Sequence, residues 1–255
     1  MKLSVYSQTM MAILIFFLAH WYLSLFSQTF FLHRYSAHKM FLMSPFWEKF
    51  FFVFTSVTQG SSYLSPYAYG ILHRMHHAYA DEEGDPHSPK HSKTVFGMFV
   101  KTWKIFDAIK FGKMDIEPRF KKDIPSWKSF DDIAYHWITR LIWGAGYTLF
   151  YIHFATHWWM FLFLPVHFMM GPLHGVIINW YAHKVGYINF KVKDTSVNLL
   201  PVDVLMMGEG YHNNHHMYPS RPNFGSKWFE LDPAYPFIVF MKWIGIVKMN
   251  SLVTS

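Results

Sequence analysis

The chain contains no cysteine among its 255 residues. Disulfides, thiolate metal ligands and a cysteine-bound iron–sulfur cluster are therefore excluded. Acidic residues are also scarce: the chain has 16 aspartates and glutamates but 23 lysines and arginines. Glycine-rich phosphate loops, nucleophile elbows, internal repeats and basic-aromatic nucleic-acid motifs are missing as well. The chemistry of this protein must depend on other side chains.

Hydrophobic residues make up 52% of the chain and aromatic residues 21%, which is typical of a membrane protein. Three long apolar runs, at about residues 10–32, 137–152 and 158–180, predict three membrane-spanning helices. The first run is too long for a secretory signal peptide, and only Lys2 precedes it among basic residues. We therefore interpret it as a helix that stays in the membrane.

Lysine and arginine indicate which parts of the chain face the cytosol. Fourteen lie within residues 33–135 and seven within 183–255, whereas the turn at 153–157 has none. The positive-inside rule then predicts that residues 33–135 and 181–255 are cytosolic and that the N-terminus lies on the opposite side. A bacterial inner membrane suits this orientation. The net charge of +7 is explained by this bias without a nucleic-acid partner.

Nine of the seventeen histidines are clustered along the chain. The pattern His-x-x-His-His occurs twice, and on a helix such offsets place all three imidazoles on one face. Nine neutral imidazoles are too many for one octahedral ion and suit two, and iron, zinc and copper all accept this ligand. The candidate ligands are His33, His38, His73, His76, His77, His183, His212, His215 and His216. The scattered His20, His136, His153, His157, His167 and His174 are expected to have structural roles.

The predicted fold is a single all-α membrane domain over residues 1–255. It has about three transmembrane helices and a cytosolic cap that carries a histidine-rich site for two metal ions. The apolar run 46–57 is too short to span a bilayer, and we expect it to lie in the interface. Residues 236–249 include two lysines and predict a second surface helix. Residues 81–132 predict short helices and loops.

The histidine clusters resemble the boxes of the membrane fatty-acyl desaturases of the stearoyl-CoA desaturase type. The resemblance extends from about residue 15 to about residue 240. Asn179-x-x-x-His183 is similar to an extra ligand pair, and Trp228-Phe229-Glu230 with Asp232 to a further family element. The boxes read His33-Arg34-Tyr35-Ser36-Ala37-His38, then His73-Arg74-Met75-His76-His77 followed by Asp85-Pro86-His87, then Gly208-Glu209-Gly210-Tyr211-His212-Asn213-Asn214-His215-His216.

This resemblance implies an oxygen-dependent enzyme that introduces a cis double bond into a long saturated acyl chain, with the delta-9 position favoured. The nine histidines would bind two irons, which zinc replaces on overexpression, and Asn179 would reach one iron through water. The substrate would be a long-chain acyl-CoA or acyl-lipid in a kinked tunnel. Because the chain has no cysteine, flavin motif or fused cytochrome signature, we expect an external electron donor of the ferredoxin, rubredoxin or cytochrome-b type with a reductase.

Several further residues are candidates for supporting roles. Animal members of this family place an Arg-Asp pair before the second box, where this chain has Ile71 and Leu72. Phe17 and Trp21 share a helix face about three to four turns from His33, which suits the closed end of a tunnel. Contacts near the metals or with a substrate head group are expected from Arg74, Asp85, His87, Lys101 and Lys104. His87 and His91 are expected to be structural or to support ligands.

Two other functions fit parts of this pattern. A membrane di-iron hydroxylase uses similar boxes but transfers oxygen to carbon, so product analysis separates it from a desaturase. A non-catalytic metal transporter or haem protein would place ionisable ligands near the middle of the membrane. The predicted spans contain no aspartate or glutamate, which disfavours that class.

Overall fold

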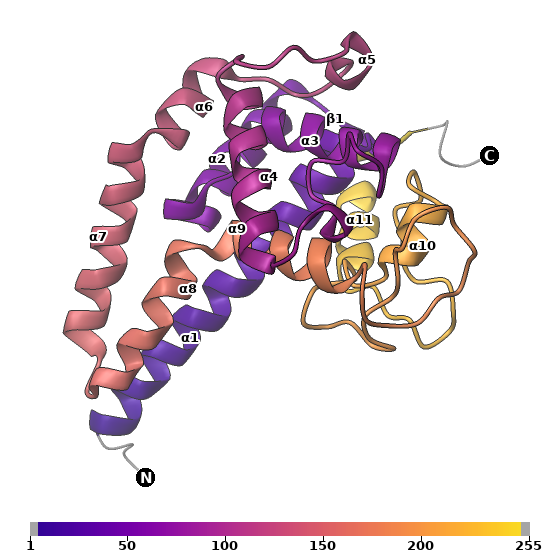
Figure 1. Ribbon diagram of the computed structural model, residues 1–255. Helices are drawn as coiled ribbons and strands as arrows, with labels where there is room; N and C mark the ends of the chain where they lie inside the picture. The colour runs from indigo at the N-terminus through magenta and orange to yellow at the C-terminus, as the bar shows by residue number, and fades with distance from the viewer. Residues whose placement is uncertain (1–4, 251–255) are drawn as a thin grey trace.

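A computed structural model describes residues 5–250 of the protein, with side chains from residue 8 onward. It is mainly helical, as the sequence predicts (Figure 1). Helix α1 (Val5–Phe26) continues into the π-helical segment η1 (Ser27–Ala37), so one continuous helix leads to the first histidine box. Helices α7 and α8 lie alongside α1, and α10 lies among loops at the other side of the molecule (Figure 1).

The predicted membrane spans correspond to helices, but a count of three is not confirmed. Among the described residues, Gln8–Ala37 alone is long and apolar enough to cross a membrane as one continuous helix. A second candidate is the pair Trp158–Phe168 and Met170–Tyr181, which is bent by 73°. This pair comprises η4 (Trp158–Phe163), α8 (Leu164–Phe168), α9 (Met170–Val176) and η5 (Ile177–Tyr181). The predicted span 137–152 lies within α7 (Trp137–Phe154), where Arg140 and His153 lower the mean hydropathy.

The segment between the first two boxes folds against the end of η1. Its elements are β1 (Phe41–Met43), α2 (Pro45–Gln59), η2 (Gly60–Ser62) and α3 (Pro66–Tyr79). Ser65 caps α3 by accepting from the Ala68 amide, and Pro66 occupies the first helical position, where no amide hydrogen is needed. Helix α2 buries Phe51 and Phe52 and exposes Phe46 and Val57. Its apolar outer face suits the interfacial position that the sequence predicts.

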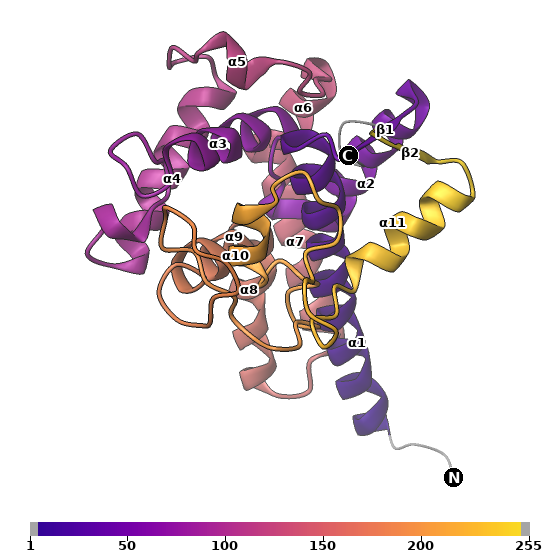
Figure 2. The same ribbon diagram turned by 90° about the vertical axis from the view of Figure 1, so that its right-hand side faces the viewer.

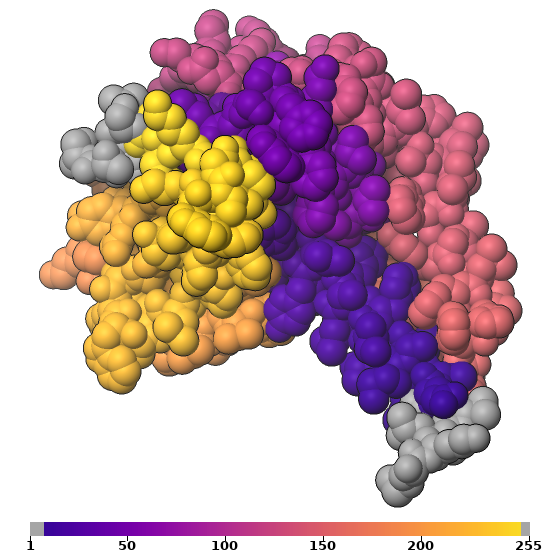
Figure 3. Space-filling view, turned by 180° about the vertical axis from the view of Figure 1, so that it is seen from behind, coloured from indigo at the N-terminus to yellow at the C-terminus, as the bar shows by residue number. Residues whose placement is uncertain are grey.

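The cap contains one long helix in addition to the short ones that were predicted. Its elements are η3 (Pro89–His91), α4 (Val95–Lys110), α5 (Pro118–Lys121) and α6 (Lys128–Tyr135), and α6 leads directly into α7. Helix α10 (His212–Met217) carries the third box. The N-terminal half of α1 and the neighbouring α7 project beyond the part of the molecule that the cap and the loops around α10 form (Figure 3).

The prediction of one surface helix over 236–249 was wrong in its second half. Helix α11 (Ala234–Trp243) ends at Trp243, and the chain then forms strand β2 (Val247–Met249). Strand β2 pairs antiparallel with β1, and Phe41 lies opposite Met249 (Figure 2). The interrupting residue is Gly245, whose φ of 79° is in the left-handed region that glycine tolerates.

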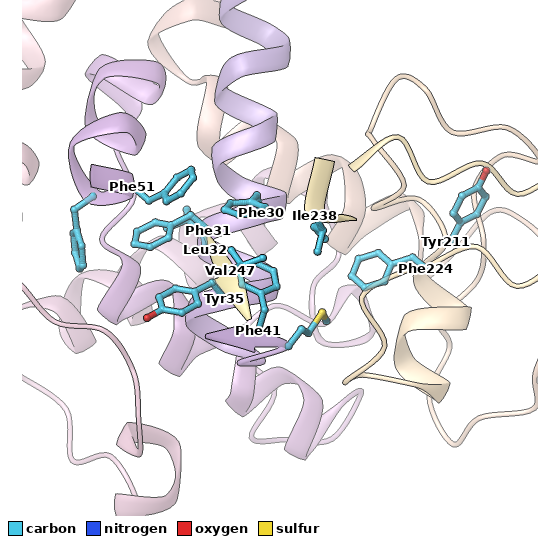
Figure 4. Close-up of a cluster of buried hydrophobic side chains, with 12 residues drawn as sticks. Phe30, Phe31, Leu32, Tyr35, Phe41, Phe51, Tyr211, Phe224, Ile238 and Val247 are labelled. Carbon is cyan, nitrogen blue, oxygen red and sulfur yellow. The ribbon is translucent and has the colours of Figure 1, made fainter. Parts of the chain in front are cut away.

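Aromatic side chains form the core around the first box (Figure 4). The ring of Phe30 lies 4.8 Å from the rings of both Phe41 and Phe51, measured between centroids. Ile238 on α11 and Val247 on β2 complete the same cluster. The end of η1 is therefore held by segments from both ends of the chain.

A buried polar cluster joins α1, α7 and α8. The Nδ1 atoms of His20 and His167 lie 2.6 Å apart, and the Tyr151 hydroxyl lies 2.9 Å from Nε2 of His167. All three side chains are buried. Since an unpaired buried polar group is costly, this cluster fixes how the three helices pack. Two of the scattered histidines thus have the structural role expected for them.

We predict that His167→Leu destabilises the protein, because His20 and Tyr151 would each keep a buried polar atom without its partner. Each loss should cost about 1–3 kcal/mol. The midpoint of thermal unfolding in detergent should fall by several degrees, whereas the exposed His153→Leu on α7 should leave it unchanged. Equal midpoints for the two variants would show that the cluster does not hold the helices together.

Candidate metal centre

The structure brings all nine clustered histidines together in two groups. Within each group the potential ligand nitrogens lie within 4.8 Å of one another. One group contains His33, His38, His73, His77 and His215, and the other contains His76, His183, His212 and His216. The imidazoles come from η1 and the residue that follows it, from α3, from α10 and from the turn after η5, so four distant segments build the centre.

The second and third boxes are each divided between the two groups, although their spacing places the three imidazoles of each box on one helix face. On α3, His73 and His77 are four residues apart and join one group, while His76 joins the other. On α10 the middle histidine is again separated, because His215 leaves His212 and His216. Each His-x-x-His-His motif therefore contributes to both groups and ties them together.

Three imidazoles have a carboxylate beside their Nδ1 atom, while their Nε2 atom faces other histidines. Nδ1 of His33 lies 2.6 Å from Glu209, Nδ1 of His76 lies 3.0 Å from Asp85, and Nδ1 of His216 lies 2.8 Å from Asp194. A neutral imidazole that donates from Nδ1 has a lone pair on Nε2. The Nε2 atoms of His76 and His216 nevertheless lie 3.2 Å apart. Two lone pairs at this distance repel unless a cation lies between them, so the residues fit a metal ion.

Burial keeps seven of the nine clustered imidazoles neutral. It lowers the pKa of six of them well below the usual 6.5, and the positive charge that neighbouring histidines would carry lowers it further. The six are His38, His73, His77, His212, His215 and His216. Burial is also the main cause that lowers the pKa of His183 to about 4. All seven are thus in the state that binds metal at neutral pH.

Asp85, His87 and Asn179 lie beside the two groups. The Asp85 carboxylate accepts from His76 and from the backbone amide of His87, so it holds the imidazole of a candidate ligand in place. The ring of His87 lies 4.2 Å from that of His76, and no described residue hydrogen-bonds its nitrogens. His91 has a structural contact with the Asp81 carbonyl. Asn179, on η5, lines the same cavity as His212.

Comparison with known proteins agrees with this geometry. The family model for fatty acid desaturases matches residues 7–238, which is most of the chain. The chain belongs to the fatty acid desaturase family. It is 32% identical over 220 residues to an sn-1 stearoyl-lipid 9-desaturase from Synechocystis, covering 85% of this chain and 64% of that protein. The resemblance inferred from the boxes is confirmed.

Other relatives have similar names. The chain is 29% identical to an sn-1 stearoyl-lipid 9-desaturase from Anabaena variabilis, over 84% of this chain and 74% of the relative. It is also 29% identical to a delta-9 acyl-lipid desaturase 2 from Arabidopsis thaliana, over 84% of this chain and 66% of the relative. The chain thus spans between about two thirds and three quarters of the length of these curated relatives.

A cavity of about 840 Å³ extends from the metal centre to the outer side of α4 and α6. His33, His73 and His212 line its inner part, together with apolar side chains such as Leu25 and Leu72. Its walls come from α1, α3, α4, α7 and α9, so it lies between the cap and the helices alongside α1. An alkyl chain in this cavity would reach both groups of histidines.

Of the residues expected near the metals or at a head group, His87 lines this cavity, whereas Arg74, Asp85, Lys101 and Lys104 do not. The Arg74 guanidinium donates to the carbonyls of Ala37, Phe120 and Lys122, and Lys101 Nζ donates to the Asp85 carbonyl. Lys104 is exposed on α4, away from the cavity lining.

Phe17 and Trp21, the expected tunnel end, do not line the cavity either. Phe17 packs against Phe163, with ring centroids 4.8 Å apart. The Trp21 indole donates to the Leu205 carbonyl and contacts the ring of His174. His174 does line the cavity, as does Met206, so the structure puts these side chains between Trp21 and the cavity.

Arg34 and Glu209 are structural residues of the centre that the sequence motifs did not reveal. The Glu209 carboxylate accepts from His33, Arg34 and Thr29. Arg34 is fully buried, forms a 2.7 Å ion pair with Asp232 and stacks on Phe224. Burial would raise the pKa of Glu209, but its contacts with His33 and Arg34 outweigh burial and lower it. Charged residues inside the boxes are the signal that could have identified them.

We expect Glu209→Gln to weaken metal binding. The amide lacks the charge that strengthens the His33 hydrogen bond, and loss of such a partner typically costs about 10–100-fold in metal affinity. Metal retained against a competing chelator measures the effect, and the exposed Glu83→Gln is the control. Equal retention in both variants would mean that Glu209 does not orient the ligand.

We also predict that the metal-free protein loses stability as the pH falls. The buried histidines have lowered pKa values in the folded state, whereas unfolded histidine titrates at about 6.5. Below that pH the unfolded chain binds more protons, so each such histidine costs about 1.4 kcal/mol per pH unit. Thermal unfolding should therefore occur at a clearly lower temperature at pH 5.5 than at pH 7.5. A pH-independent midpoint contradicts the neutral state of the site.

Proposed function

We propose that this protein is an oxygen-dependent desaturase that introduces a cis double bond at the delta-9 position of a long saturated acyl chain. The family membership supports the reaction class, and the names of the relatives support the position. The observation that carries the proposal is the pair of histidine groups beside an apolar cavity of about 840 Å³. Such a cavity is large enough for an extended alkyl chain.

The reaction removes one hydrogen atom from each of two neighbouring methylene groups. Together with two external electrons and two protons, these hydrogens reduce dioxygen to two molecules of water. Two irons, when bound by the nine histidines with Asn179 acting through water, would supply this redox chemistry. The protein contributes the position of the chain: apolar side chains such as Leu25, Leu72 and Ile178 exclude water and align the methylenes beside His33 and His212.

The proposal includes a membrane location and an external donor. The apolar outer surface of α1 and α7 suits contact with lipid, as exposed Leu14, Ile15 and Leu149 illustrate. The lysine and arginine bias supports a cytosolic metal centre, with the N-terminus on the other side of a bacterial inner membrane. Three spans would require both α7 and the bent pair that follows it to cross. Electrons would come from a ferredoxin, rubredoxin or cytochrome-b-type protein with its reductase.

Fatty-acid profiling of a bacterial host that lacks delta-9 desaturation tests this function. Expression of the chain should produce monounsaturated acyl chains with the cis double bond between carbons 9 and 10. The purified protein should hold about two irons. His215→Ala should abolish product, because Nε2 of His215 lies 3.0 Å from that of His33 and 2.9 Å from that of His77.

The control is His153→Ala, since His153 is exposed on α7 and lies far in sequence from the boxes. It should give the same product as the unchanged protein. Hydroxylated fatty acids instead of unsaturated ones would favour the hydroxylase reading. Saturated chains alone, from a protein that is folded and loaded with iron and supplied with a donor, would reject both.

A further inference from the structure

The metal centre has two different sides. The clustered histidines that line the cavity of about 840 Å³ are His33, His73 and His212. The clustered histidines that are not fully buried do not line this cavity, and they are His38, His77 and His216. The ring centroid of His77 lies 4.8 Å from that of His38 and 4.6 Å from that of His216, so these three are neighbours. The centre therefore comes nearest to the surface on a side that the substrate cavity does not occupy.

Helix α10 leads from this side of the centre to the surface. His216 is followed by Met217 and Tyr218, whose side chains are 42% and 41% exposed. Electron transfer through protein slows steeply with distance, so a donor must bind where the path to a metal ligand is short. Met217 is joined to His216 by one peptide bond. Electrons that enter at the end of α10 would thus reach a candidate ligand directly.

The segment 190–194 lies along the end of α10. The ring centroid of Phe190 lies 5.2 Å from that of Tyr218, and the Asp194 carboxylate accepts from Nδ1 of His216. Both ends of the segment are thus fixed to α10, and the two lysines between them are exposed. An exposed arginine follows α10, and its amide donates to the Tyr218 carbonyl. We call this region the α10 surface, and it comprises Phe190, Lys191, Lys193, Met217, Tyr218 and Arg221.

The acidic side chains in this part of the chain point inward. Residues 183–250 contain seven lysines and arginines, all of them exposed, and five aspartates and glutamates, none of them exposed. The acids bind imidazoles, the Arg34 guanidinium, an asparagine and backbone amides inside the fold. They are Asp194, Asp203, Glu209, Glu230 and Asp232. Acids of this part of the chain therefore leave the cations of the α10 surface free to attract an anionic partner.

Two exposed acids of the cap adjoin one edge of the α10 surface. The Asp81 carboxylate accepts from the amide of Thr195, next to the segment 190–194, and Glu82 and Glu83 follow Asp81 in the chain. An acidic partner would meet like charge at this edge and opposite charge elsewhere. Such a pattern fixes the orientation in which the partner binds.

The α10 surface is separated from the helices that suit contact with lipid. Helices α7 and α8 lie alongside α1 on one side of the molecule, and α10 lies on the other side (Figure 1). Helix α7 exposes apolar side chains along its length, such as Leu141 and Leu149. The α10 surface has only a small exposed centre, formed by Met217 and Tyr218, with cations beside it. This composition is typical of small, transient interfaces between proteins.

We propose that the α10 surface docks a small acidic electron-transfer protein, which supplies electrons from the side of the centre that the substrate cavity does not occupy. This inference rests on the proposed function and specifies where the external donor binds and which charge it carries. Each double bond requires two electrons, so a one-electron carrier must dock, leave and be replaced within one turnover. Weak binding that depends on charge suits this exchange.

A binding experiment on the full-length protein tests the surface. The metal-loaded protein in nanodiscs of uncharged phosphatidylcholine is titrated with a plant-type [2Fe–2S] ferredoxin, an acidic one-electron carrier, and microscale thermophoresis measures the affinity. The Kd should be on the order of 10 μM at low salt and should rise at least about fivefold when salt screens the charges. Lys191→Glu combined with Arg221→Glu should weaken binding by about tenfold or more, because repulsion replaces attraction.

The matched control is Lys242→Glu combined with Lys248→Glu. It makes the same charge change in two exposed lysines of α11 and β2, which lie apart from α10 (Figure 2). Its affinity for ferredoxin should stay within about twofold of that of the unchanged protein, since salt and distance screen these charges. Lys191→Gln combined with Arg221→Gln, a milder change, should weaken binding less than the glutamate pair does.

Absence of ferredoxin binding to the unchanged protein, or equal affinities of the two glutamate pairs, overturns the docking surface. Binding in detergent that is lost in nanodiscs also overturns it, because lipid would then cover the surface. The outcome is separable from that of the proposed function. Ferredoxin binding at the α10 surface of a protein that forms no double bond rejects the activity alone. A delta-9 product from a protein whose two glutamate pairs bind ferredoxin equally rejects the docking surface alone.

Discussion

His33, His76 and His216 each have a carboxylate at Nδ1, and this turns the lone pair on Nε2 toward another imidazole. Lone pairs held this close repel one another, so the fold must supply the force that keeps them together. The aromatic core around Phe30 and the buried ion pair between Arg34 and Asp232 supply part of it. The packing of the surrounding helices therefore offsets this repulsion in the metal-free protein, and bound cations would remove it.

The nine histidines could be identified from the sequence because their spacing is local. Their division into two groups could not, since it depends on how α3 and α10 meet, where His76 contacts His216 and His77 contacts His215. The role of Glu209 was missed for the same reason. Glu209 precedes His212 in the chain, but its carboxylate contacts His33 of the first box. A motif reports which residues share a helix, whereas the identity of the facing partner is a property of the tertiary fold.

The helical class and the apolar outer face of α2 also followed from hydrophobic patterning. Lys101 and Lys104 do not line the cavity beside the histidines. Exposure and charge in a sequence do not reveal which cations already have partners. Lys101 and Lys110 lie on the same helix, yet one donates to a backbone carbonyl and the other joins two aspartates at a cavity wall. The π-helical η1 and the pairing of β1 with β2 had no local signal at all.

The pairing of β1 with β2 also constrains biosynthesis. Residues 41–43 follow the first box directly, but their partners at 247–249 leave the ribosome some two hundred residues later. The helix that carries His33 must therefore enter the membrane and wait while the rest of the chain is made. Contacts so distant in sequence form slowly. A metal ion that bound before this strand pair closed would sit in a site whose first helix is not yet held by the end of the chain.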